Sequence, residues 1–101
     1  MEILGSSAGK PRKRGFPAES SESWPHASAS SEDAEVARLI VLNLMAAVKG
    51  RGLRGVAREA GIDEKTLRQL IAGASYPDVR TVARLEVALQ VALYPEWPRG
   101  R

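Results

Sequence analysis

Hydrophobic positions recur with helical spacing from about residue 32 to residue 94, whereas residues 1–30 show no usable period. In the most informative part, Val56 and Ala57 precede Gly61, and Leu67 and Leu70 lie three residues apart beyond it. Residues three or four apart share one face of a helix, so these apolar side chains are expected to face one core. A glycine supplies the positive φ that a tight turn between helices needs. The pattern therefore predicts two short helices joined by a turn at Gly61.

The same reasoning predicts an all-α fold, a compact bundle of four to five helices that contains a helix-turn-helix. The first expected helix starts after a cap at Ser30 or Ser31 and stops at Gly50, and the second covers Leu53 to Ala60. The third covers Glu64 to Ala72, with Asp63 as its cap and Gly73 as its stop. The fourth is capped by Asp78 and runs to about Leu89. Val91 to Tyr94 is expected to add an extended or one-turn segment packed on the core.

Composition divides the chain into three parts. Residues 1–30 are rich in Ser, Gly, Pro and Ala, so we expect a disordered tail. Residues 31–94 form the predicted helix-turn-helix domain, and residues 95–101 a flexible C-terminal end. Trp24 and Trp97 flank the domain in Pro-rich text, and the sequence leaves open whether either docks on it.

The residue inventory argues against catalysis. The chain has 101 residues, no cysteine and a single histidine, His26, which leaves almost nothing for a thiolate metal site or a Ser–His pair. No phosphate-binding glycine loop is present, so we expect a protein that is not an enzyme, with no cofactor, no metal site and no small-molecule substrate. The longest apolar stretch is too short to span a bilayer, and we expect no membrane contact and a cytoplasmic, nucleoid-associated location.

Charge gives only weak guidance. The formal net charge is +3, yet residues 31–97 hold nine basic and nine acidic side chains, which cancel. Their distribution is more informative, because Lys49, Arg51, Arg54 and Arg58 lie within ten residues and only Glu59, which follows them, opposes their charge. A neutral domain with one basic edge is compatible with contact to DNA.

The stretch GLRGVAREAGIDEKTLRQLIAG, with the Tyr-Pro loop and DVRTVARLEVAL that follow, resembles the lambda-repressor-like helix-turn-helix domains of the XRE or Cro-type group. Ala57, Gly61, Leu67 and Gly73 match that family's spacing. The resemblance implies a four- or five-helix bundle, often dimeric, whose third helix enters the major groove. Gln90 stands where the family usually has glycine, and two prolines follow soon after, so a full fifth helix is not expected.

The third helix presents an outward polar face able to read base edges in a major groove. The base-contact candidates are Glu64, Lys65, Arg68 and Gln69. The candidates for phosphate contact are Arg54, Thr66, Ser75 and Tyr76, and a basic cluster in the tail, Lys10, Arg12, Lys13 and Arg14, is a candidate N-terminal arm. For most of these residues a solvated surface role stays open as the alternative.

The sequence is therefore compatible with two functions. The first is a sequence-specific regulator that binds double-stranded DNA with helix 64–72. The second is a protein-interaction module, antitoxin- or adaptor-like, on the same scaffold. The apolar first helix, with Leu42 and Met45 prominent, suits a homodimer or a protein partner in the second case, although core packing is the leading explanation for it.

Overall fold

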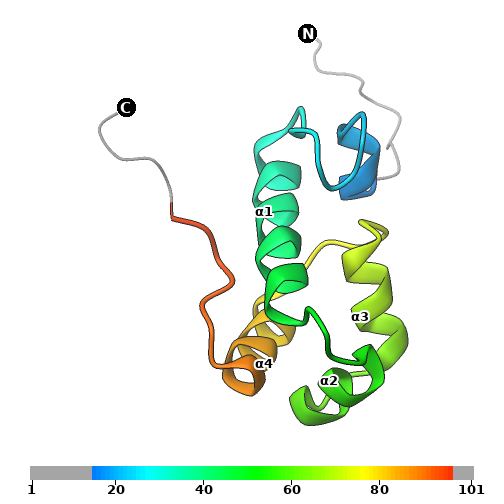
Figure 1. Cartoon of the computed structure of the whole chain (residues 1–101). Coiled ribbons are helices and arrows are strands. Elements are labelled where there is room, and N and C mark those ends of the chain that lie inside the picture. The colour runs from blue at the N-terminus through cyan, green and yellow to red at the C-terminus, as the bar shows by residue number, and fades with distance from the viewer. Residues whose placement is uncertain (1–14, 97–101) are drawn as a thin grey trace, which may run out of the picture.

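The computed structural model describes residues 15–96 and shows an all-helical molecule in that range (Figure 1). Its elements are the 3₁₀-helix η1 (Pro17–Ser20) and the α-helices α1 (Glu32–Ala47), α2 (Leu53–Ala60), α3 (Glu64–Ile71) and α4 (Val79–Leu89). The four predicted α-helices are confirmed, with boundaries within about two residues of those expected. Among the described residues, no helix has both the length and the apolar character that crossing a membrane requires.

Local side-chain and backbone signals set the ends of these helices. The Ser31 hydroxyl accepts a hydrogen bond from the Ala34 N–H at 3.3 Å, and the Asp78 carboxylate accepts one from the Thr81 N–H at 2.7 Å. Gly61 and Gly73 both have a φ of +72°, the left-handed conformation that ends a helix without steric cost for glycine. These signals explain why α1, α2, α3 and α4 could be delimited from the sequence.

The cap expected at Asp63 is only half formed. Its backbone has the extended conformation of an N-cap, but its side chain makes no capping hydrogen bond. The carboxylate is left exposed at the start of α3, and the direction of the helix is set instead by the turn at Gly61.

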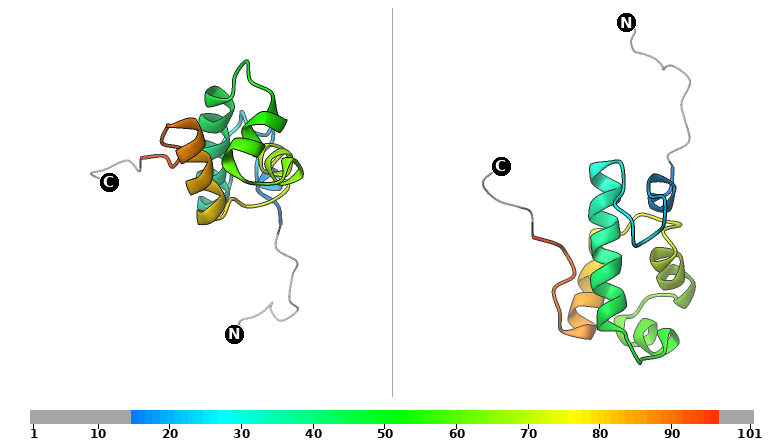
Figure 2. Two further views of the ribbon diagram at one scale, coloured as in Figure 1. Left: turned by 90° about the horizontal axis from the view of Figure 1, so that it is seen from below. Right: turned by 45° about the horizontal axis from the view of Figure 1, so that its top comes forward.

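The core lies along one side of α1, the longest helix, which packs against η1 and α3 (Figure 2). It is formed by Ile40, Val41, Leu44, Val48, Val56, Ala57, Ala60, Leu67, Leu70, Val82, Leu85 and Leu93. The predicted segment after α4 is extended rather than helical, and it delivers Leu93 to this core. The Asn43 side-chain amide donates to the Leu93 carbonyl at 2.8 Å, and Glu86 accepts from the Leu93 N–H at 2.7 Å. Gln90, where the resembling family favours glycine, takes the left-handed conformation with a φ of 57°.

Residues 15–30 correct the predicted extent of the disordered tail, because this segment folds onto the domain. Pro17 and Pro25 are buried, the Ala18 N–H donates to the Gly73 carbonyl at 3.0 Å, and the Trp24 indole N–H donates to the Ile71 carbonyl at 2.9 Å. The disorder predicted from composition was wrong for residues 15–30, because a few prolines and one tryptophan supply enough apolar contact to order the segment. Residues 1–14 and Trp97 lie outside the described residues.

A partly buried ion pair ties the same segment to α1. Arg38, only 8% exposed, donates through both Nε and Nη2 to the Glu35 carboxylate and through Nη1 to the Pro25 carbonyl. Glu35 also accepts from the Ala29 N–H at 2.8 Å. The Arg38 hydrogen bond, and after it the Ala29 hydrogen bond, lower the pKa of the Glu35 carboxyl from 4.5 to about 2. The Glu35 carboxylate therefore stays ionised at any pH near neutral, and the ion pair with Arg38 stays intact there.

The end of α3 and the N-terminal segment meet at Gly73. A Cβ placed on this residue would lie 2.6 Å from Trp24 Cε2 and 2.7 Å from the Ala18 Cβ. Such distances are well inside van der Waals contact, so only glycine fits the position. Gly73 is thus required twice, by its backbone conformation and by the close approach of the indole ring.

We expect Gly73→Ala to destabilise the protein by about 2–5 kcal/mol, because a left-handed residue with a side chain costs about 1–2 kcal/mol and overpacking adds about 1–3 kcal/mol. The matched control is Gly50→Ala, since Gly50 has a φ of +79° but nothing within 4 Å of an added Cβ. That variant should lose only about 1–2 kcal/mol. Urea unfolding followed by circular dichroism measures both, and equal losses would contradict the packing described at Gly73.

Candidate nucleic-acid interface

The unit formed by α2, the turn at Gly61 and α3 fixes the position of the candidate site. The Ile62 N–H donates to the Ala57 carbonyl at 3.0 Å, and Ala57 is only 2% exposed, which lets α2 approach its neighbours closely. Arg84 of α4 donates to the Gly61 carbonyl at 2.9 Å. The turn is therefore held by hydrogen bonds from its own helices and from α4.

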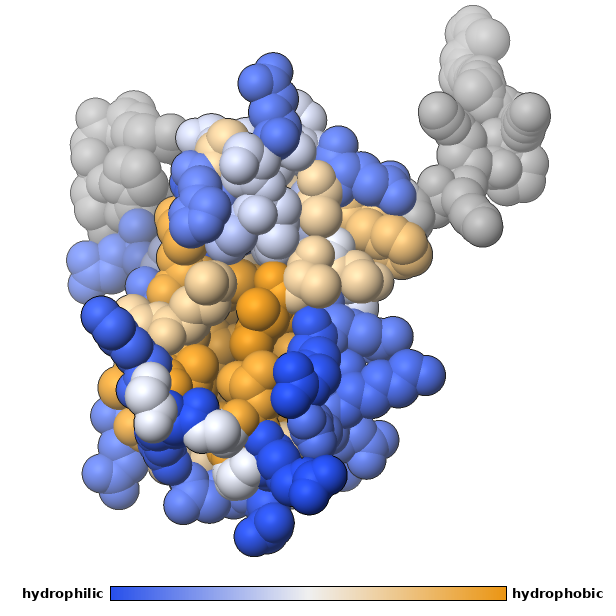
Figure 3. All heavy atoms as spheres, turned by 45° about the vertical axis from the view of Figure 1, so that its right-hand side comes forward, coloured by the Kyte–Doolittle hydropathy of each residue, from blue (hydrophilic) through white to orange (hydrophobic). Residues whose placement is uncertain are grey.

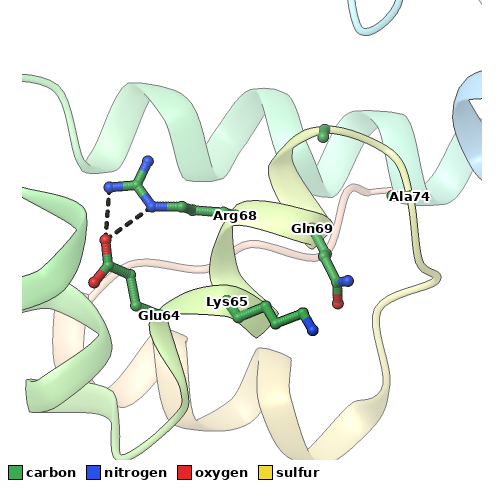
Figure 4. Close-up of a pocket in the computed structure, with 6 residues that line it drawn as sticks. Glu64, Lys65, Arg68, Gln69 and Ala74 are labelled. Atoms are coloured by element: carbon green, nitrogen blue, oxygen red, sulfur yellow. Dashed lines mark hydrogen bonds and ion pairs between the residues drawn. The ribbon is translucent and has the colours of Figure 1, made fainter.

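The helix α3 buries one side and presents the other. Leu67 and Leu70 are at most 2% exposed, whereas the opposite side lines a shallow, mostly apolar hollow on the molecular surface (Figure 4). The residues that line this hollow are Glu64, Lys65, Arg68, Gln69, Ala72 and Ala74. All four predicted base-contact residues are thus brought together on one surface, which we call the α3 face.

Two of these four residues are engaged with each other. Arg68 donates to the Glu64 carboxylate from Nε at 2.8 Å, and its Nη2 lies 2.6 Å from the same oxygen (Figure 4). The other carboxylate oxygen of Glu64 lies 3.5 Å from Nε of Arg54 on α2. Arg68, and to a lesser degree Arg54, lower the pKa of the Glu64 carboxyl. Glu64 therefore acts as an anionic bridge between two arginines.

The other two residues are unengaged. Within residues 15–96, neither the side chain of Lys65 nor that of Gln69 makes a hydrogen bond or an ion pair, and both residues are exposed. Figure 4 shows their polar ends close together, on the side of the hollow away from the Glu64–Arg68 pair. Lysine supplies only donors, whereas the glutamine amide supplies both a donor and an acceptor.

The predicted phosphate contacts are split between two places. Arg54 is 81% exposed beside the start of α3, where Glu64 holds it. Thr66, Ser75 and Tyr76 are half-buried and line a second hollow, which Gln69 also borders. The start of α4 closes that second hollow with Asp78, whose pKa is lowered chiefly by the Thr81 N–H. This fixed negative charge makes the second hollow a weaker anion site than its hydroxyl groups alone would suggest.

Among the residues that the structure describes, one of the other members of the predicted basic edge is paired with an acid and two are not. Arg51 is paired with Glu59 at 2.6 Å, while Lys49 and Arg58 are exposed and without an ion pair in the part of the chain that the structure describes. The candidate arm, Lys10, Arg12, Lys13 and Arg14, lies outside the described residues. Over residues 15–96, no group of three or more His, Cys, Asp or Glu side chains is placed to hold a metal ion.

The sequence reasoning missed Ala74 and did not assign a role to Trp24. Ala74 follows the helix stop, so periodicity gave no reason to place it on the α3 face. Trp24 lies 47 residues from Ile71 in the chain, and only the presence of a large aromatic in Ser-rich text could have drawn attention to it. Trp24 does not reach the α3 face, but it holds the end of α3 in place.

Comparisons with protein-family models, with curated proteins and with solved structures find no match for this chain. The resemblance to the lambda-repressor-like domains therefore rests on the chain's own residues, chiefly Ala57, Gly61, Leu67 and Gly73. It stays a prediction, and the function has to be argued from the α3 face.

Proposed function

We propose that this protein is a sequence-specific DNA-binding regulator that places α3 in the major groove of double-stranded DNA. The observation that carries the proposal is the pair of exposed, unengaged side chains Lys65 and Gln69 on the outward face of a helix fixed at both ends. An α-helix fits the major groove, and a helix restrained at both ends fixes the positions from which its outward side chains reach the bases.

Each polar residue of the α3 face has a distinct role in this proposal. Gln69 pairs with adenine, because its amide matches the donor and acceptor that adenine presents in the major groove. Lys65 donates to a base acceptor or to a phosphate. Glu64 restrains Arg54 and Arg68, so these two guanidinium groups reach the DNA only when they exchange the carboxylate for a phosphate or a guanine.

The remaining contacts are proposed at the phosphate backbone. Thr66, Ser75 and Tyr76 supply hydroxyl groups beside Gln69, and the basic arm at residues 10–14 joins the chain immediately before the docked segment. Phosphate contacts position a protein on the duplex and make its affinity fall with salt.

A second candidate function, binding of a protein partner or a second copy of the chain, is favoured by a different observation. Met45 on α1 is a large hydrophobic residue that is 37% exposed. Separately, hydrophobic residues gather at the centre of the side of the molecule that carries α3, and hydrophilic residues surround them (Figure 3). Exposed apolar surface of this kind marks interaction sites. Affinity that does not respond to salt would support this function over DNA binding.

The first test is fluorescence anisotropy of the purified chain with a pool of random duplexes. We expect the affinity to fall by about an order of magnitude or more between about 50 and about 200 mM salt. We also expect the double variant Lys65→Ala with Gln69→Ala to lose sequence preference, because each base contact supplies about 1–3 kcal/mol of discrimination.

Lys49→Ala is the matched control for that variant, since Lys49 is also exposed and unpaired in the described structure. It is expected to keep the sequence preference even where it weakens binding uniformly. No binding at either salt concentration would reject DNA as the ligand, and an unchanged preference in the double variant would reject the assigned readout.

A second test uses the anionic bridge. We expect Glu64→Gln to bind duplex DNA about tenfold more tightly at about 50 mM salt, because the substitution removes a charge that repels phosphate and releases two arginines. The slope of log affinity against log salt concentration should become steeper by about one to two, since each released arginine can contact one more phosphate. Glu59→Gln removes one carboxylate and releases Arg51 away from the α3 face, so it serves as the control. An equal gain in both variants would show that only net charge matters.

A further inference from the structure

The α3 face carries an apolar feature that the proposed contacts of Lys65 and Gln69 do not use. Its hollow is mostly apolar even though four of its six lining residues are polar. The apolar surface comes from the methyl groups of Ala72 and Ala74 and from the aliphatic stems of the longer side chains. Ala72 is exposed and Ala74 is half-buried, so the two methyl groups are open to a ligand.

The polar groups around the hollow are unequal in what they offer. The guanidinium of Arg68 is drawn to one side by Glu64, and this leaves the stem of Arg68 rather than its charge over the hollow (Figure 4). The Gln69 amide is free at the other side, and the unpaired ammonium of Lys65 lies close to it. The site thus combines methyl groups, one free amide and one positive charge.

Only one base presents a methyl group in the major groove of unmodified DNA, and that base is thymine. Adenine is the base whose edge matches a glutamine amide. The positive charge of Lys65 complements the phosphate backbone that surrounds any base in the groove. Guanine is most often read by the donors of an arginine or a lysine. Glu64 holds Arg68 here, so within the described residues of the α3 face only Lys65 is free to donate to a guanine, whereas the methyl groups and the Gln69 amide match an A·T pair.

We propose that Ala72 and Ala74 form a subsite for the 5-methyl group of a thymine, next to the adenine that Gln69 reads. The protein then prefers sites with adjacent A·T pairs. This inference rests on the proposed function, since it names the base pairs that the same face recognises.

The test starts from duplexes selected from a random pool by the full chain. Each thymine of the selected site is then replaced in turn by deoxyuridine, which removes only the methyl group and keeps every hydrogen bond. We expect about a fourfold loss of affinity at one or two positions, the loss that corresponds to one buried methyl-sized group, and no change at the others.

A variant of the protein assigns the effect to its residues. The double variant Ala72→Ser with Ala74→Ser should bind the thymine and deoxyuridine duplexes equally, because hydroxyl groups replace the apolar surface. Ala92→Ser, at an exposed alanine in the segment after α4, is the control and should keep the fourfold difference. Circular dichroism confirms that each variant is folded.

The outcomes separate this inference from the proposed function. Selective binding that depends on Gln69 but shows no deoxyuridine effect would overturn the methyl subsite alone. A selected site with no A·T pair would overturn both the methyl subsite and the adenine readout assigned to Gln69, and would leave DNA binding itself standing. No binding to any duplex would overturn this inference and the proposed function together. A deoxyuridine effect that persists unchanged in the Ala72→Ser, Ala74→Ser variant would place the methyl contact elsewhere on the protein and overturn the assignment.

Discussion

The contact between Trp24 and Gly73 is the interaction on which the arrangement of α3 depends. The indole ring occupies the space that any side chain at position 73 would need, and its N–H satisfies the Ile71 carbonyl at the end of the helix. The last carbonyl groups of a helix have no partner within it, so this hydrogen bond completes α3 from outside. Ala18 adds a second hydrogen bond to the same end, at the carbonyl of Gly73.

The other end of α3 is held in a comparable way. Gly61 turns the chain between α2 and α3, and Arg84 donates to its carbonyl from α4. The Arg38–Glu35 pair in turn fixes residues 25–29 against α1, so the segment that carries Trp24 is itself anchored. The outward side chains of α3 thus stand on a helix with both termini restrained. Restraint of this kind is what a surface needs to recognise a ligand by fixed geometry.

Charge on the α3 face is arranged by one acid. Glu64 engages Arg54 and Arg68 together, so of the four predicted base-contact residues only Lys65 and Gln69 are left without a partner in the described range. These ion pairs are largely exposed and contribute little to folding. They decide instead which polar groups of the α3 face are available to a ligand. The available groups are those of Lys65 and Gln69, which lie beside the methyl groups of Ala72 and Ala74.

The helices were predictable because their signals are local. Gly61, Gly73 and Asp78 mark helix ends within a few residues of the apolar pattern, and Leu67 and Leu70 show which side of α3 is buried. The N-terminal segment was not predictable from the same signals, because its order depends on contacts such as that between Trp24 and Ile71, 47 residues apart.

The candidate site divides along the same line. Periodicity gave the residues that share the outward face of α3, since spacing alone decides that. It did not give the bridging role of Glu64, which depends on where α2 places Arg54, or the contribution of Ala74, which depends on the turn after Gly73. Side-chain pairing between elements is a property of the packed structure and has no signature in one segment of sequence.

The most direct measurement is an amide-resolved NMR titration of the full chain with a pool of random duplex DNA at about 50 mM salt, repeated at about 200 mM. The account predicts that shifts concentrate on α3, strongest at Lys65 and Gln69 and extending to Ala74, and that they weaken at the higher salt. Shifts centred on α1 around Met45, or no shifts at either salt concentration, would contradict it.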